Sequence, residues 1–209
     1  MSLSDFQRTI IEGTTDEYRA RLFDYDGSQI LLAQIATLKL TLHLPSDTTS
    51  AGIINSRNAQ DVLNLNNVTF ASSSVAVTAA SNASPIVITA TAHGFSDGDL
   101  ISVVGVTGNL AANVRKDEHG EWIPWEIEKV DANSFKLLRS TGTGAWVSGG
   151  TATKNLLTWS MQAADNDIVG AAAIDALEEH VALFEWTYGT PTKTGAHEFR
   201  HNVINLGRR

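Results

Sequence analysis

The sequence contains no cysteine among its 209 residues, which excludes several kinds of chemistry. Neither a disulfide framework nor a thiolate metal site is possible, and cysteine cannot act as a nucleophile. Basic residues are also scarce, because 15 Lys and Arg stand against 23 Asp and Glu and give a net charge of −8. This balance opposes approach to phosphate backbones, so we expect no nucleic-acid partner.

Long apolar runs are missing as well. No stretch reaches the roughly eighteen consecutive apolar residues that suggest a membrane-spanning helix. The start of the chain, Met1–Asp5, lacks the basic and apolar regions of a secretory signal. We therefore expect no membrane partner and synthesis without secretory export. The length suits one or two domains, each able to bury a core without metal or disulfide.

Strand patterning is what the sequence does contain. Apolar and polar residues alternate over 36–44, the period of a strand with one buried face. Residues 66–70 and 156–161 show two more strands, which would form an ordinary hairpin if the residues between them were removed. Roughly eighty residues intervene, too many for a structureless loop in a compact domain. The pattern predicts a domain inserted into the hairpin.

The remaining segments of the outer domain are also strand-like. The predicted strands are Glu17–Phe23, Gln29–Ala33, Val181–Tyr188 and Glu198–Leu206. With the three above they make six or seven strands at the spacing of an immunoglobulin-like sandwich. The Ala-rich run Ala171–Leu177, within residues 165–179, suggests one or two turns of helix. The predicted fold is all-β, an Ig-like antiparallel β-sandwich interrupted by a small inserted β-barrel-like domain.

The inserted segment has strands and turns of its own. Five short strands are predicted, at residues 75–79, 86–91, 100–104, 125–130 and 135–139. We therefore divide the chain into an N-terminal arm (1–17), a discontinuous sandwich (18–73 with 155–209) and an insert (74–154). Trp122, Trp125 and Trp146 lie in the insert, where they form either its core or, if exposed, a binding face.

The N-terminal segment predicts a short helix over Ser4–Gly13, with Leu3, Phe6 and Ile10 on one side. Such a helix is too short to persist alone. It either packs on its own domain or acts as an arm that grips a neighbouring subunit, which makes these three residues candidate interaction residues.

One motif points to metal chemistry. Residues 197–201 read His-Glu-Phe-Arg-His, the H-E-x-x-H pattern of zinc proteases. The pattern binds zinc only on a helix, where residues four apart lie one turn above each other. Here the segment is strand-like, so His197 and His201 would lie roughly 13 Å apart. We expect a solvated strand face and no metal site.

Other chemical motifs are weak. The turn at Asp24–Gly27 lacks the further ligands of a calcium loop, and the glycines of 142–150 are followed by no Lys-Ser or Lys-Thr at phosphate-loop spacing. No nucleophile elbow is present. We therefore expect no catalytic residue, no cofactor and no enzyme activity.

Several segments of the outer domain resemble a family of tailed-bacteriophage virion proteins, in their immunoglobulin-like structural domain. These segments are Ile53–Asn64, Asn66–Thr69, Leu157–Asn166, His180–Trp186 and Asn205-Leu206. In relatives without the insertion, the Asn-Asn-Val-Thr strand runs through a short turn into the Leu-Thr-Trp strand. The resemblance therefore implies the same interrupted hairpin as the strand pattern.

The insert resembles a second phage-associated module, the small β-domain compared with the FCCH domain of ubiquitin-activating enzyme. The matching segments are Ala92–Asp99, Val104–Gly108, Val130–Phe135 and Ser148–Ala152. The likeness concerns fold only. The stretch Arg115–Trp125 departs from it, being longer and more charged than the expected turn.

Together the resemblances imply a structural component of a tailed-phage virion, with a neck or tail position in the head–tail region favoured. They imply a homo-oligomer that binds other phage structural proteins in the virion, assembled in the cytoplasm of the bacterial host, with the insert projecting from the surface. The alternatives are a capsid decoration protein and a carbohydrate- or receptor-binding module. In the latter, exposed tryptophans of the insert would stack on a glycan.

Overall fold

The computed structural model describes residues 8–45, 47, 49, 51–63, 67–169 and 177–206. Its regular elements are strands and three short 3₁₀ turns, so the fold is all-β, as predicted. The described residues form two compact units. The first comprises those within 1–20, 33–70 and 157–209, and the second comprises 21–32 and 71–156. Two of the four boundaries between the units fall inside strands, β5 (Val68–Ala76) and β13 (Thr151–Met161).

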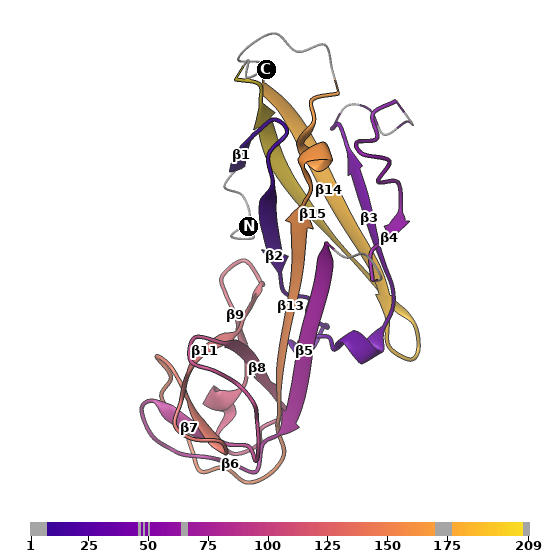
Figure 1. Cartoon of the computed structure of the whole chain (residues 1–209). Coiled ribbons are helices and arrows are strands. Elements are labelled where there is room, and N and C mark those ends of the chain that lie inside the picture. The colour runs from indigo at the N-terminus through magenta and orange to yellow at the C-terminus, as the bar shows by residue number, and fades with distance from the viewer. Residues whose placement is uncertain are drawn as a thin grey trace. The chain divides into compact units, whose positions relative to one another are not determined.

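A five-stranded sheet forms one layer of the first unit, in the order β1-β15-β14-β3-β4. Its strands are β1 (Arg8–Ile11), β3 (Ile35–His43), β4 (Gln60–Asp61), β14 (Leu177–Tyr188) and β15 (Lys193–Ile204). Strands β14 and β15 form a long antiparallel hairpin, visible in Figure 1 in orange to yellow. The predicted strands at 36–44, 181–188 and 198–206 are confirmed, and the last two begin earlier than predicted.

The second layer of the first unit is built on β13. Strand β2 (Asp16–Ala20) pairs with one edge of β13, and β5 pairs with the other, where the Ser160 N–H donates to the Asn67 C=O at 2.8 Å. The predicted hairpin between residues 66–70 and 156–161 is thus confirmed. Period-two alternation directs Leu157, Trp159 and Met161 into the core, where each is at most 1% exposed.

Aromatic contacts hold the two layers of the first unit face to face. Tyr18 of β2 stacks on Phe184 at 5.8 Å between ring centroids and lies 4.4 Å from Phe199. Trp159 meets Phe184 edge to face at 5.6 Å. Burial raises the pKa of Tyr18 above its ordinary value, so its hydroxyl stays neutral.

The N-terminal helix prediction is wrong for its described part. Residues Arg8–Ile11 form β1, which pairs in parallel with β15 so that Arg8 lies opposite His201 and Ile11 opposite Ile204. Thr9, Ile10 and Ile11 are β-branched and favour a strand over a helix. Ser4–Gln7 lie outside the described residues.

The helix expected within residues 165–179 is also not found where the structure describes them. A 3₁₀ turn spans Ala163–Asn166, and β14 already begins at Leu177. Most of the Ala-rich run, residues 171–176, lies outside the described part.

The second unit contains four of the five predicted strand regions, and the strand predicted at 75–79 is wrong, because β5 ends at Ala76 and β6 begins only at Ala79. Its strands are β6 (Ala79–Ala80), β7 (Ile86–Thr89), β8 (Leu100–Val104), β11 (Trp125–Lys129) and β12 (Ser134–Leu137). They hydrogen-bond in the order β8-β11-β12-β7-β6, and β8 also pairs with residues 151–153 of β13. The core is a single apolar cluster around Phe95, Phe135 and Trp125. A 3₁₀ turn, Leu110–Ala112, packs beside it.

The stretch Arg115–Trp125 forms a hairpin that the sequence did not predict. Strands β9 (Arg115–Lys116) and β10 (Trp122–Ile123) pair around a turn at Asp117. The backbone N–H groups of Glu121 and His119 donate to the Asp117 carboxylate, at 2.9 Å each, and hold the pKa of that carboxyl below its usual value. The turn therefore loses this contribution when acid protonates Asp117.

Residues 21–32 belong to the second unit, although the sequence assigned them to the sandwich. The segment carries only a bridge, Phe23 opposite Gln29, and a 3₁₀ turn, Leu32–Gln34, in place of the predicted strand 29–33. Buried Asn155 of β13 fixes it: its side chain donates to the Leu22 and Ile30 carbonyls at 2.7 and 2.8 Å. Long-range polar contacts of this kind leave no local pattern in the sequence.

Gly195 in β15 lies beneath the indole of Trp186, its cross-strand partner in β14. A Cβ on Gly195 would lie 2.4 Å from Trp186 Cε2. We expect Gly195→Ala to displace the indole and lower the free energy of unfolding of the first unit by about 1–3 kcal/mol in urea titrations. Thr194→Ala, at the exposed neighbour, serves as control and should change it by no more than about 0.5 kcal/mol. An unaffected Gly195→Ala would contradict this packing.

Candidate functional site

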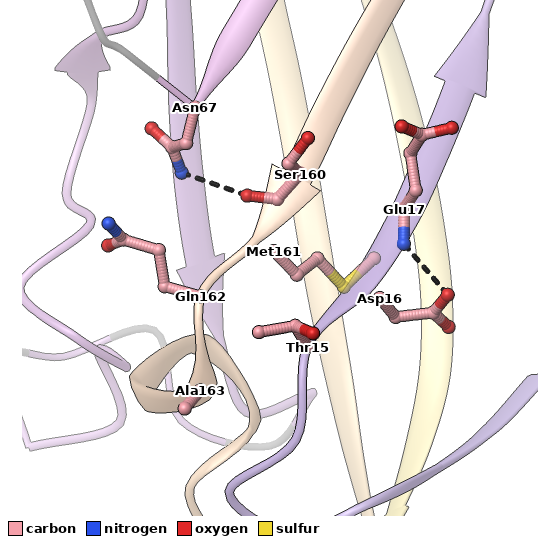
Figure 2. Close-up of a pocket in the computed structure, with 8 residues that line it drawn as sticks. All are labelled: Thr15, Asp16, Glu17, Asn67, Ser160, Met161, Gln162 and Ala163. Carbon is pink, nitrogen blue, oxygen red and sulfur yellow. Dashed lines mark hydrogen bonds between the residues drawn. The ribbon is translucent and has the colours of Figure 1, made fainter.

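An open hollow of about 700 Å³ lies at the end of the layer formed by β2, β13 and β5. It is lined by Thr15, Asp16, Glu17, Asn67, Ser160, Met161, Gln162 and Ala163. Figure 2 shows Met161 between the Asn67–Ser160 pair and the Asp16–Glu17 pair. These residues come together because the starts of β2 and β5 meet the end of β13 in an antiparallel layer.

The lining of the hollow exposes mostly apolar surface, although several of its side chains carry polar groups around the buried Met161 thioether. Asn67 Nδ2 donates to the Ser160 carbonyl at 3.2 Å, and the Glu17 N–H donates to Asp16 Oδ1 at 2.7 Å. Arg19 Nε donates to Glu17 Oε1 at 2.6 Å in an exposed ion pair. The hydroxyls of Thr15 and Ser160 lie in the lining, but no histidine does. The arrangement offers hydrogen bonds and negative charge to a ligand, and pairs no hydroxyl with an imidazole base.

A buried ion pair is contiguous with the hollow through Gln162. Both Arg57 and Asp165 are nearly inaccessible, with 3% and 0% of their side chains exposed. The guanidinium holds the carboxylate through two hydrogen bonds, Nε to Oδ1 and Nη2 to Oδ2, the second at 2.9 Å. The bidentate geometry links the loop before β4 to the 3₁₀ turn that follows β13.

Neighbouring groups complete the coordination of this ion pair. The Asp165 carboxylate also accepts from Asn55 Nδ2 at 2.7 Å and from the Gln162 N–H at 2.8 Å. The Arg57 guanidinium also donates from Nη1 to Gln60 Oε1 at 2.8 Å and from Nη2 to Gln162 Oε1 at 3.1 Å. The guanidinium carbon lies 5.9 Å from the Trp159 ring centroid. The ion pair thereby joins the loop that contains Asn55, Arg57 and Gln60 to the segment Gln162–Asp165 beside the hollow.

The H-E-x-x-H residues lie on strand β15, as the sequence predicts. His197 stacks against Tyr18 at 6.1 Å, while buried His201 meets Asn166 Oδ1 through Nε2 at 3.1 Å. Asn166 also donates to the Thr14 carbonyl at 2.8 Å. The two imidazoles lie on the same face of one strand, with the Phe199 side chain between them. Across the described ranges, no group of three or more His, Asp or Glu side chains is placed to hold a metal ion.

The predicted interaction residues fall into three groups. Leu3 and Phe6 lie outside the described residues. Ile10 is buried, at 4% exposure, and is not available to a partner, which corrects its assignment. Trp125 is also buried: its Nε1 donates to the Ala112 carbonyl at 3.1 Å and Arg115 lies over its ring at 4.7 Å. Its role is in the core.

Trp122 and Trp146 are partly buried. Lys116 Nζ lies 4.6 Å from the Trp122 ring centroid, and Gly27, at φ 87°, is so close that a Cβ there would lie 2.8 Å from the indole. Trp146 packs on the core and donates to the Gly149 carbonyl at 3.1 Å. Of the three tryptophans, these two are the more accessible residues.

The different burial of the tryptophans predicts different effects of truncation. We expect Trp125→Ala to lower the free energy of unfolding of the second unit by about 3–5 kcal/mol, because it leaves a cavity and an orphaned carbonyl. Trp122→Ala should lower this free energy of unfolding by less than half as much, because Trp122 is only partly buried. Chemical denaturation monitored by circular dichroism measures both. Equal losses would contradict the assignment of Trp125 alone to the core.

Sequence reasoning missed the Arg57–Asp165 ion pair and the hollow. The only local signal was the run Ser56-Arg57-Asn58 within a polar stretch, which is equally typical of a surface loop.

None of the helices in the described part is long and apolar enough to cross a membrane. No family model matches the sequence, and a search of curated proteins finds no match either.

Proposed function

We propose that this chain is a structural component of a tailed-phage virion, placed in the neck or tail, where its first unit binds neighbouring subunits. In this proposal the first unit is an Ig-like sandwich and the second an FCCH-like module at the particle surface. The observation that carries it is the interrupted hairpin of β5 and β13. These strands pair as the virion family's uninterrupted hairpin implies, yet the chain between them forms a separate compact unit.

The hollow supports a binding role for the first unit. Its mostly apolar surface is edged by the carboxylates of Asp16 and Glu17 on β2 and by the amides of Asn67 and Gln162 beside β5 and β13, and the buried Arg57–Asp165 pair lies next to it. Surfaces on rigid strands suit repeated contacts between identical subunits, because little order must be gained on assembly. We place the contact with a neighbouring subunit at this hollow.

The proposal is tested by locating the protein in particles. Antibodies raised against the purified chain are bound to phage particles induced from a bacterial strain that encodes it, and labelled particles are imaged by electron microscopy. Label at the junction of head and tail or along the tail is the expected result. Label distributed over the head would favour capsid decoration, and unlabelled particles in which the chain is also missing by mass spectrometry would overturn the virion role.

A second candidate function is glycan binding by the second unit. The observation that favours it is the partly accessible ring of Trp122, flanked by exposed Lys116 and by Ile123, which is 36% exposed. Aromatic faces bearing nearby cations bind sugar rings and their acidic substituents. A glycan array separates the candidates: binding that Trp122→Ala removes and Trp146→Ala retains would support it. An array without signal would leave the structural role alone.

A further inference from the structure

His93 is a buried histidine in the loop between β7 and β8 of the second unit. Only 4% of the residue is exposed, and its ring contacts the rings of Phe95 and Phe135, at 5.3 and 5.1 Å between centroids. The second unit lies wholly within the described residues, so every side chain of that unit around the ring is placed. A buried imidazole is notable because histidine is the side chain that changes charge near neutral pH.

Both ring nitrogens of His93 are bonded to backbone groups whose roles are fixed. The Phe95 N–H donates to Nδ1 at 3.0 Å, so Nδ1 carries a lone pair. The Asp131 C=O can only accept, so Nε2, which lies 3.0 Å from it, carries the hydrogen. These partners specify one neutral tautomer. A further proton must bind to Nδ1, where it would face the Phe95 N–H and end that hydrogen bond.

The backbone on both sides of His93 is held in the left-handed region. Gly94 has a φ of 67° and Ala92 a φ of 52°, a conformation that glycine adopts freely and that is unfavourable for alanine. Contacts with residues 131–133 retain it: the Ala92 N–H donates to Asn133 Oδ1 at 3.0 Å, and the His93 N–H donates to the Ala132 C=O at 3.2 Å. Loop 90–95 is thus held closed against the preference of Ala92.

One carboxylate, that of Asp131, faces His93 from the neighbouring loop. Hydrogen bonds from the Asn133 N–H and the Ser134 side chain hold the pKa of the Asp131 carboxyl below its usual value, and attraction to His93 contributes least. Asp131 is exposed, so water and salt screen this attraction. The carboxylate therefore offers an imidazolium little compensation for leaving water.

The other charged groups of the neighbouring segments give no such compensation either. Phe135 of β12 lies opposite Lys129 of β11, which is exposed and carries the same charge as an imidazolium. In the segment that follows the loop, Asp97 accepts from the Lys129 N–H at 2.6 Å, and Asp99 pairs with Lys154 at 2.7 Å. The closed loop therefore favours the neutral ring.

We propose that His93 is a pH switch in the second unit: the neutral ring holds loop 90–95 against residues 131–133, and uptake of one proton releases the loop. The protonated ring would set two donors against each other and bury a charge beside two phenylalanine rings. Both costs end when the ring moves into water, and Ala92 then relaxes.

The sign of the pH dependence follows from proton binding. The open loop binds one proton more than the closed loop, so the closed loop becomes more stable as pH rises. It is stable at neutral pH and is lost as pH falls through the range in which histidine side chains titrate, roughly pH 7 to 5. The switch is a property of the second unit and does not depend on the proposed virion function.

NMR of the whole chain tests the tautomer and its coupling to the loop. At neutral pH the ring nitrogens of His93 should give the signals of the Nε2–H tautomer. The protection factor of the Phe95 amide against hydrogen exchange should fall by about tenfold or more between about pH 7.5 and about pH 5.5, because its acceptor is lost. The Val114 amide, which donates to the Val103 C=O at 2.7 Å, should keep its protection factor.

His93→Asn is the matched variant that cannot take up a proton. An asparagine oxygen accepts from the N–H two residues further on, as in an Asx turn, so the bond to the Phe95 amide is kept and the bond to Asp131 is lost. The Phe95 protection factor should start lower than in the unmodified chain and change by less than about twofold over the same pH range. His119→Asn, at a histidine whose side chain is 52% exposed, should keep the full response to acid.

Ala92→Gly tests the backbone strain without changing the imidazole. Glycine adopts the left-handed conformation freely, so the closed loop should resist acid better than in the unmodified chain. The protection factor of the Phe95 amide at the acid end of the titration should be about two- to fivefold higher.

Four results would overturn the switch. They are an Nδ1–H tautomer at neutral pH, a Phe95 protection factor that acid leaves unchanged, an acid response in His93→Asn equal to that of the unmodified chain, and equal losses of protection at Phe95 and Val114. The last would mean that acid loosens the whole unit and that the loop has no transition of its own.

Discussion

Replacing Arg57 with Met is expected to lower the free energy of unfolding of the first unit by about 3–5 kcal/mol. The side chain of Met fills much the same space, so the loss comes from charge and hydrogen bonding. Asp165 would remain fully buried with only Asn55 and the Gln162 N–H as donors. A buried carboxylate without its cation is costly because the low dielectric around it does not replace hydration.

A double variant shows whether the lone charge causes this loss. In Arg57→Met/Asp165→Asn the carboxylate is gone, so the loss should be smaller than the sum of the two single losses by about 1 kcal/mol or more. Urea titrations at neutral pH measure all three variants. Strict additivity would contradict direct coupling between Arg57 and Asp165.

Arg200→Met is the matched control for the arginine. It removes the same group from the same unit, but the Arg200 side chain is 50% exposed and its partners, Glu198 and Glu179, are exposed or half-buried. Exposed ion pairs contribute little, so the change should be within about 1 kcal/mol. A loss at Arg200 as large as that at Arg57 would mean that burial does not decide the effect.

Asn155→Leu is expected to destabilise the second unit by about 3–5 kcal/mol and to detach residues 21–32 from β13. The amide, 1% exposed, accepts from the Leu22 N–H at 3.2 Å and donates to the Leu22 and Ile30 carbonyls. Leucine has the same branched shape but no donor or acceptor, so the Leu22 N–H and the Ile30 C=O would lose their Asn155 partner, each at a cost of about 1–3 kcal/mol before relaxation. The Leu22 C=O would keep only the Ile30 N–H.

Hydrogen exchange separates local detachment from general loss of stability. The Ile30 N–H, which donates to the Leu22 carbonyl at 2.9 Å, should exchange much faster in Asn155→Leu than amides in β12. Asn133→Leu is the control, because exposed Asn133 makes one hydrogen bond through Oδ1, from the Ala92 N–H at 3.0 Å, and should cost about 1 kcal/mol. Uniform acceleration of exchange throughout the second unit would contradict the local role of Asn155.

Strand positions were predictable because their signal is local. The alternation in 36–44, the pairing of 66–70 with 156–161 and the apolar runs near 86, 100 and 135 each reflect one strand with one buried face. The same argument correctly placed His197 and His201 on a strand, since Gly195 and the β-branched Val203-Ile204 flank them. The hairpin at Arg115–Ile123 was not predicted, because its paired strands have two residues each. Strands this short show no alternation of apolar and polar residues.

The candidate site was not predictable in the same way. Residues of its lining are up to about 150 positions apart, since Thr15 and Asp16 meet Met161 and Gln162 only through the pairing of β2 with β13. Arg57 and Asp165 come from polar stretches typical of surface loops, and only their mutual burial makes them different. The tryptophans of the insert illustrate the same limit, because composition left their burial open.

The sequence alone determined that the fold is all-β, where its main strands lie and that a hairpin is interrupted, because alternating hydrophobicity is a property of each strand by itself. Only the tertiary structure decided that residues 21–32 join the second unit, that Arg8–Ile11 extend a sheet, and that Arg57 and Asp165 are buried together. These depend on hydrogen bonds between residues far apart in the chain, whose energy is set by the surroundings that folding creates.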